Sequence, residues 1–151
     1  MNIPKILNRK KNFLSPWVSI YEDKVLDKNG KTEIYHSILV PDYVCILAIN
    51  NNKMVPLVKQ FRHAVNKVTL ELPAGLCENK KNPEDAAINE LFEETGFKSD
   101  SEIKTLLKIL PCTGRLSNNG WCYFVDNIFK VNCWKPESNL EVIMVPSSNL
   151  L

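Results

Sequence analysis

The chain lacks the features by which membrane, secreted and zinc-binding proteins are recognised. None of its apolar runs approaches the length of a membrane-spanning helix, and the N-terminus has no apolar core of a signal peptide. Its five cysteines are odd in number and form no Cys-x-x-Cys pair, so the sequence predicts neither a disulfide framework nor a zinc site. These absences predict a cytoplasmic protein that does not bind membranes.

A strong excess of one charge is also lacking. The formal net charge is +2, which is too small to indicate nucleic acid as a partner. The basic residues near the N-terminus (Lys5, Arg9, Lys10 and Lys11) are explained by a solvated tail. No repeat or low-complexity linker interrupts the 151 residues, a length that suits one domain with a real core. We therefore predict a single domain over residues 1–151, with residues 1–14 as a flexible N-terminal segment.

Alternating or continuous apolar segments predict many strands. The expected strands are residues 17–26, 33–40, 43–50, 54–61, 68–72, 103–110, 121–131 and 140–145. The turn signal Asp27-Lys28-Asn29-Gly30 separates the first two, which are expected to form a hairpin. Pro56 places its strand at an edge or a bulge, because proline cannot donate a hydrogen bond to a neighbouring strand.

One segment is predicted to be a helix. Asn82 suits the N-cap, Pro83 the first helical position and Gly96 the left-handed residue that ends a helix. Its apolar stripe is expected to comprise Ala87, Ile88, Leu91 and Phe92. Many strands with one central helix indicate an α/β (α+β) fold.

Three carboxylates gather at the end of this helix. Glu90, Glu93 and Glu94 lie three and four residues apart and share one face. The helix dipole disfavours negative charge there, and like charges at this spacing each cost about 0.2–0.5 kcal/mol. A divalent cation reverses the sign of that cost, since Mg²⁺ is held by carboxylates together with substrate phosphates. A solvated acidic face is the alternative, but a glycine on either side of the helix favours the metal site.

These residues carry a family resemblance. The segment from Gly75 to Phe97 resembles a Nudix box, whose pattern is Gly, five residues, Glu, seven residues, Arg-Glu, an aliphatic, any residue, Glu-Glu, any residue, Gly and an aliphatic. The spacing is kept, and the matching residues after Gly75 are Glu90, Leu91, Glu93, Glu94, Gly96 and Phe97. The flanking segments 59–62, 71–75 and 113–118 are similar to the ADP-ribose pyrophosphatase branch, so the likeness covers roughly residues 15–146. It implies a Nudix-type α/β/α sandwich with a mixed β-sheet.

Two positions depart from the pattern. Lys81 stands where the box has its first Glu, and Asn89 stands where it has Arg. An Arg at position 89 would pair with Glu93 four residues later, whereas Asn offers only a neutral amide. Since loosened support of metal ligands commonly costs about 10–100-fold, we expect weaker metal binding or slower turnover.

The resemblance also implies roles for individual residues. Glu90, Glu94 and the Ala74 carbonyl would hold Mg²⁺, with Mn²⁺ as the alternative, and Glu93 would support them in catalysis. The expected substrate-binding residues are Arg62, Glu71, Trp17 and Tyr35. Arg62 has a fork of donors suited to a phosphate, and a surface cation at a strand end is its other interpretation. Trp17 and Tyr35 would stack on adenine, and the alternative interpretation of both residues is ordinary hydrophobic packing.

The general base is left open. In the branch that the chain resembles, it is commonly a Glu in the loop before the last strand, where this sequence has Glu137 and, on the strand itself, Glu141. Neither aligns with the family position, which falls near Ser138. Glu93 is the third candidate, because box carboxylates orient the water in other branches.

The function implied is metal-dependent hydrolysis of the pyrophosphate linkage of a nucleoside diphosphate sugar. ADP-ribose is the first candidate and would give AMP and ribose 5-phosphate. The expected partner is therefore a small nucleoside diphosphate derivative, and a homodimer is compatible with the resemblance because branch members often exchange N-terminal strands. Two alternatives remain: a weakened or inactive homologue that binds nucleotide sugars, and an interaction subunit that keeps only the fold.

Overall fold

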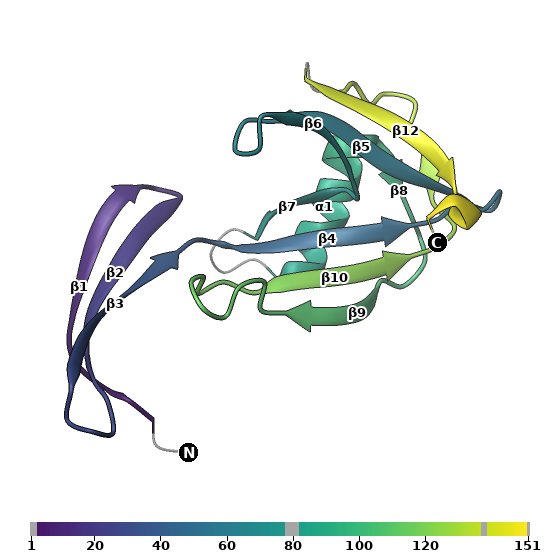
Figure 1. Ribbon diagram of the computed structural model, residues 1–151. Helices are drawn as coiled ribbons and strands as arrows, with labels where there is room; N and C mark the ends of the chain where they lie inside the picture. The colour runs from purple at the N-terminus through teal and green to yellow at the C-terminus, as the bar shows by residue number, and fades with distance from the viewer. Residues whose placement is uncertain (1–2, 78–81, 137–138, 151) are drawn as a thin grey trace. The chain divides into compact units, whose positions relative to one another are not determined.

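The computed structural model describes residues 3–77, 82–136 and 139–150 (Figure 1). They belong to two compact units, called here unit 1 (residues 1–41 and 110–119) and unit 2 (residues 42–109 and 120–151). The single domain over residues 1–151 therefore stays a prediction. No helix in the described ranges is long and apolar enough to cross a bilayer.

Unit 1 is built on an antiparallel sheet in the order β1-β2-β3, comprising β1 (Lys5–Ser15), β2 (Val18–Leu26) and β3 (Thr32–Leu39). The predicted hairpin is confirmed as β2 and β3, and its turn is fixed by Asp27, which accepts backbone hydrogen bonds from Asn29 and Lys31 at 2.8 Å. The basic residues expected in a flexible segment are instead part of β1. Arg9 pairs there with Asp23 of β2 at 2.6 Å, so this basic residue is matched to an acidic neighbour.

Unit 2 contains the remaining elements. They are β4 (Asp42–Ala48), β5 (Met54–Arg62), β6 (Lys67–Glu71), β7 (Ala74–Cys77), α1 (Pro83–Thr95), β8 (Phe97–Lys98), β9 (Lys104–Ile109), β10 (Gly120–Val125), β11 (Phe129–Lys130), β12 (Leu140–Pro146) and the 3₁₀ turn η1 (Ser147–Asn149). One sheet has the order β7-β4-β10-β9 and is mixed, because β4 and β10 run parallel while the other pairs are antiparallel. A second sheet has the order β12-β5-β6 and is antiparallel, and β11 pairs with β8.

Helix α1 forms the core of unit 2 with these sheets. It contacts β4, β7 and β10 of the mixed sheet and β5 and β12 of the other (Figure 1). The core cluster includes Val44 and Ile46 of β4, Leu91 of α1 and Tyr123 of β10. The mixed α/β fold class is thus confirmed. The described residues contain one α-helix, α1, so they supply one helical layer of the expected sandwich.

The expected ends of the helix are confirmed. The Asn82 side chain accepts a hydrogen bond from the backbone N–H of Glu84 at 3.3 Å, and Gly96 adopts the left-handed conformation with φ of +67°. The buried face differs from the expected stripe. Ile88 is 44% exposed, whereas Ala86 and Thr95 are buried, because the helix is turned slightly from the orientation that the apolar residues suggest.

Two strand predictions need correction. The expected strand over residues 121–131 ends at Val125, because Asn127 has a φ of +54° and redirects the chain, and residues 129–130 then pair with β8. Pro56 lies in the central strand of its sheet rather than in an edge strand. Its missing N–H is nevertheless tolerated, since β6 pairs only with residues 58–62 of β5 and leaves Pro56 with β12 as its one neighbour.

Candidate active site

Two carboxylates of α1 lie against the first residues of strand β7. Glu94 accepts a hydrogen bond from the backbone N–H of Ala74 at 2.9 Å. Glu90 packs so closely on Gly75 that a Cβ at position 75 would lie 2.1 Å from its carboxylate. Only glycine leaves room for Glu90 at this point. The structure therefore brings together three of the predicted metal-site residues, Ala74, Glu90 and Glu94.

Two more predicted residues form an ion pair in the neighbouring sheet. Arg62 of β5 donates Nε–H to Glu71 at 3.1 Å and an Nη2 hydrogen to the other carboxylate oxygen at 2.6 Å. The hydroxyl of Thr69 also donates to Glu71, at 2.6 Å. The hydrogen bond from Arg62 lowers the pKa of Glu71, and the hydrogen bond to Glu71, with a smaller contribution from the charge of Glu94, raises the pKa of Arg62. Arg62 keeps three N–H groups that Glu71 does not use.

The end of α1 is held by two residues that the sequence analysis missed. The Trp134 indole donates a hydrogen bond from Nε1 to the carbonyl of Glu93 at 2.9 Å. The Lys130 ammonium donates to the carbonyl of Thr95 at 2.6 Å and lies 3.8 Å from the Trp134 ring centre. Burial lowers the pKa of Lys130. Since α1 has no basic residue in its last turn, Lys130 supplies the positive charge that complements this end of the helix.

The donor set fits a hard divalent cation that shares its coordination with a substrate. Two carboxylates and a backbone carbonyl are oxygen donors of the kind that Mg²⁺ prefers. Within residues 3–77, 82–136 and 139–150, no group of three His, Cys, Asp or Glu side chains is arranged to hold a metal ion.

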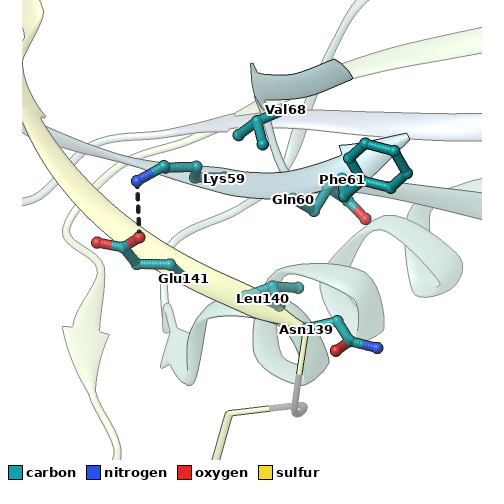
Figure 2. Close-up of a pocket in the computed structure, with 7 residues that line it drawn as sticks. All are labelled: Lys59, Gln60, Phe61, Val68, Asn139, Leu140 and Glu141. Atoms are coloured by element: carbon teal, nitrogen blue, oxygen red, sulfur yellow. Dashed lines mark hydrogen bonds and ion pairs between the residues drawn. The ribbon is translucent and has the colours of Figure 1, made fainter. Parts of the chain in front are cut away.

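The candidates for the general base lie in different places. Glu93 is exposed on α1. Glu141 lies on β12 opposite Lys59 of β5, with which it forms an ion pair at 2.9 Å. The side chains of Glu141 and Lys59 lie beside a shallow hollow of about 290 Å³, which is also lined by Phe61 and Val68 (Figure 2). Because side chains alternate along a strand, this is the face of the sheet opposite to Arg62 and Glu71. The structure thus does not bring Glu141 together with the carboxylates of α1, and Glu137 lies outside the described residues.

The predicted aromatic residues belong to unit 1. Trp17 is 59% and Tyr35 40% exposed, so neither is an ordinary core residue. The Tyr35 hydroxyl donates to the carbonyl of Gly114, and the guanidinium of Arg115 lies 5.4 Å from the Tyr35 ring centre. Their role in substrate binding stays a prediction.

The structure describes one of the two residues that depart from the box. Asn89 is exposed on α1, four residues before Glu93. Lys81 lies outside the described residues.

Comparisons with known proteins agree with this geometry. The NUDIX domain model matches residues 40–131, which is more than half of the chain, so the chain belongs to the Nudix family. The predicted family resemblance is thereby confirmed.

Among its relatives, an ADP-ribose pyrophosphatase of Bacillus subtilis is 32% identical over 125 residues, which are 83% of this chain and 64% of that protein. An ADP-sugar pyrophosphatase of Mus musculus is 34% identical over 95 residues, 56% of this chain and 44% of that protein. The chain thus spans less than two thirds of the length of these relatives. A crystal structure of an ADP compounds hydrolase has the same fold, with a TM-score of 0.84 at 20% identity, and the match covers 99% of this chain and 82% of that one.

Proposed function

We propose that the protein is a divalent-metal-dependent Nudix hydrolase that cleaves the pyrophosphate linkage of a nucleoside diphosphate sugar, with ADP-ribose as the first candidate. The observation that carries the proposal is the convergence of Glu90 and Glu94 on Ala74 and Gly75 at the start of β7. Relatives named as ADP-ribose and ADP-sugar pyrophosphatases support the substrate class. Hydrolysis of ADP-ribose breaks one P–O bond to the bridging oxygen and yields AMP and ribose 5-phosphate.

The charges at this end of α1 explain why a metal is required. Glu90, Glu93 and Glu94 repel a pyrophosphate, and Arg62 is already paired with Glu71. A divalent cation neutralises phosphate charge and lowers the pKa of a bound water. Glu90, Glu94 and the Ala74 carbonyl would hold it. Mg²⁺ suits these donors, and Mn²⁺ is the second choice.

The chain's own residues bind the substrate and move the proton. Arg62 donates its remaining N–H groups to a phosphate oxygen, while Glu71 holds the guanidinium in one orientation. Trp17 and Tyr35 of unit 1 stay the predicted adenine-stacking residues, since these residues are 59% and 40% exposed. Glu93 accepts a proton from the attacking water, because it shares α1 with the metal-site carboxylates whereas Glu141 is paired with Lys59 on the outer face.

The first experiment incubates the purified protein with ADP-ribose and a panel of nucleoside diphosphate sugars, each with Mg²⁺, Mn²⁺ or EDTA, and identifies products by mass. AMP and ribose 5-phosphate in the metal-containing samples alone would support the proposal. Glu90→Gln should abolish that turnover and leave the fold intact. No cleavage of any substrate, together with a rise in melting temperature on adding ADP-ribose, would overturn hydrolysis and favour a nucleotide-sugar-binding homologue.

The assignment of the base is tested by three matched variants. Glu93→Gln should lower kcat about 10²–10⁴-fold and remove the acidic limb of the pH–rate profile, with little change in KM. Glu141→Gln should keep both within a factor of about two, since its partner is Lys59. If Glu137→Gln or Glu141→Gln loses the acidic limb while Glu93→Gln retains it, the assignment to Glu93 is wrong.

A further inference from the structure

Two cysteines face each other at the centre of the mixed sheet. Cys45 of β4 and Cys122 of β10 are direct partners in the parallel pairing of these strands. Their sulfur atoms lie 3.2 Å apart, within hydrogen-bonding distance for thiols. Residues that are distant in the sequence are thus held side by side by the backbone register.

Both thiols lie on the face of the sheet that turns away from α1. Val44 and Ile46, on either side of Cys45, are fully buried in the core with α1, and so is Tyr123 beside Cys122. Because side chains alternate along a strand, the two cysteines point to the opposite face. There they are half-buried, and Leu107, which pairs with Cys122 from β9, is 46% exposed. A small oxidant therefore has access to them.

The Cα separation of the pairing is compatible with a disulfide. Neighbouring strands lie about 4.8 Å apart, and disulfides join residues whose Cα atoms are separated by about 4.4–6.8 Å. The sulfur atoms have to move from 3.2 Å to a bond length of about 2.05 Å. Forming the bond requires rotation about the two Cα–Cβ bonds and a slightly closer approach of the Cβ atoms, because parallel strands lie about 4.8 Å apart and a disulfide holds its Cβ atoms about 3.5–4.5 Å apart.

We propose that Cys45 and Cys122 form a redox-active dithiol, which a peroxide oxidises to an intramolecular disulfide between β4 and β10. In the first step one sulfur attacks a peroxide oxygen, so that an S–O bond forms, the O–O bond breaks and water leaves. In the second step the other thiol attacks the resulting sulfenic sulfur, so that the S–S bond forms, the S–O bond breaks and a second water carries away the thiol proton. The two thiols lose two electrons and the peroxide gains them.

The environment of the pair affects how readily a thiol ionises. Burial and the neighbouring thiol raise the pKa of Cys45 to about 12, so this sulfur stays protonated at neutral pH. The thiolate is the reactive form of cysteine, so attack on the peroxide requires a proton to leave one of the two thiols. A small dithiol reductant restores the pair by thiol–disulfide exchange.

The test treats the purified full chain with hydrogen peroxide and maps its peptides by mass without reduction. The expected product is a peptide joining Cys45 to Cys122, lighter than the two reduced peptides together by about 2 Da and reversed by dithiothreitol. Cys122→Ser and Cys45→Ser should each abolish it. A Cys112→Ser/Cys133→Ser double variant is the matched control and should retain it, because these two cysteines are exposed and lie elsewhere. Cross-links to other cysteines, or irreversible oxidation of Cys45 and Cys122, would overturn the proposal.

Thermal melting gives a second readout that needs no substituted residue. A bond closing the long segment between residues 45 and 122 restricts the unfolded chain, so the oxidised protein should melt roughly 5–15 °C above the reduced protein. A lower melting temperature after oxidation would show that the strands do not accept the bond, and would contradict the geometry argued above. Both readouts are independent of the proposed hydrolase activity.

Discussion

At the scale of single residues, the absence of a side chain at Gly75 allows the Glu90 carboxylate to lie close to the backbone of β7. Gly75→Ala places a Cβ about 2.1 Å from the Glu90 carboxylate, so the carboxylate has to move. We expect kcat/KM to fall about 10–100-fold and the affinity for Mn²⁺ to fall with it, because displaced support of metal ligands costs this much. Gly114→Ala is the matched control, since no atom lies within 4 Å of its Cβ position. Equal kinetics and Mn²⁺ affinity for Gly75→Ala and wild type would refute the close approach.

The Arg62–Glu71 pair predicts a dependence of stability on pH. Arg62 lowers the pKa of folded Glu71 below its ordinary value of 4.5. The pair therefore stabilises the fold above pH 4.5, and this contribution is lost as the pH falls through the folded pKa. The free energy of unfolding of the wild type should exceed that of Glu71→Gln by up to about 1 kcal/mol at pH 7, since both side chains are partly exposed, and the difference should shrink as the pH is lowered below 4.5. Urea unfolding measures it, with exposed Glu102→Gln as control; a gap that widens in acid would reverse the assigned sign.

The residues of the site differ in how far the sequence predicts them. The spacing of Glu90 and Glu94 along one helix predicts that they share a face, whereas Ala74 was placed with them by the resemblance to the Nudix box. Trp134 contacts the carbonyl of Glu93 from 41 residues away. This contact depends on the pairing of β11 with β8, and no local sequence pattern predicts that pairing.

At the scale of elements, the contribution of each apolar residue of α1 to stability depends on how deeply its side chain is buried. Leu91 is 2% exposed in the core, whereas Ile88 is 44% exposed. Leu91→Ala should lower the free energy of unfolding by about 2–5 kcal/mol, and Ile88→Ala by about 0.5 kcal/mol or less. Urea denaturation of the two variants measures the difference. Similar losses in both would mean that the sequence-based stripe, which included Ile88, describes the helix better than the structure does.

The end of α1 depends on Lys130. Lys130→Met keeps the apolar stem but leaves the Thr95 carbonyl without its ammonium donor, so we expect a loss of about 1–3 kcal/mol. Lys130→Arg should recover part of this loss, and Lys135→Met, at an exposed position, should have almost no effect. Hydrogen exchange should locate the loss in the last turn of α1. Faster exchange spread evenly over the whole helix would contradict a local role.

Most strands were predictable because one face of each is apolar. Strand β1 was not predicted, because its residues are largely exposed and its basic residues are typical of a solvated tail. The ion pair of Arg9 depends on Asp23, which belongs to another strand. Strand β7 escaped because Ala74 and Gly75 have no strand preference of their own. Its conformation follows from the pairing with β4.

At the scale of the whole molecule, unit 1 predicts self-association. Phe13 and Leu14 of β1 are 68% and 62% exposed, and Ile34 of β3 is 56% exposed. Burial of such exposed apolar side chains on association is favourable, so we expect the mass in sedimentation to rise with concentration from 17.3 kDa towards twice that value. Phe13→Lys should shift this rise to higher concentration. A constant mass of 17.3 kDa at all concentrations would exclude the homodimer.

The order of strands in the sheets also sets the timing of folding during synthesis. β4 must wait for β10 as its parallel neighbour, and β5 must wait for β12. A nascent chain that has emerged only as far as α1 can pair β4 with β7 and β5 with β6, but β4 and β5 each still lack their second neighbour, so cooperative folding of unit 2 begins late. Ribosome-bound intermediates halted before β10 should be sensitive to protease, and resistance should appear once β12 has left the exit tunnel.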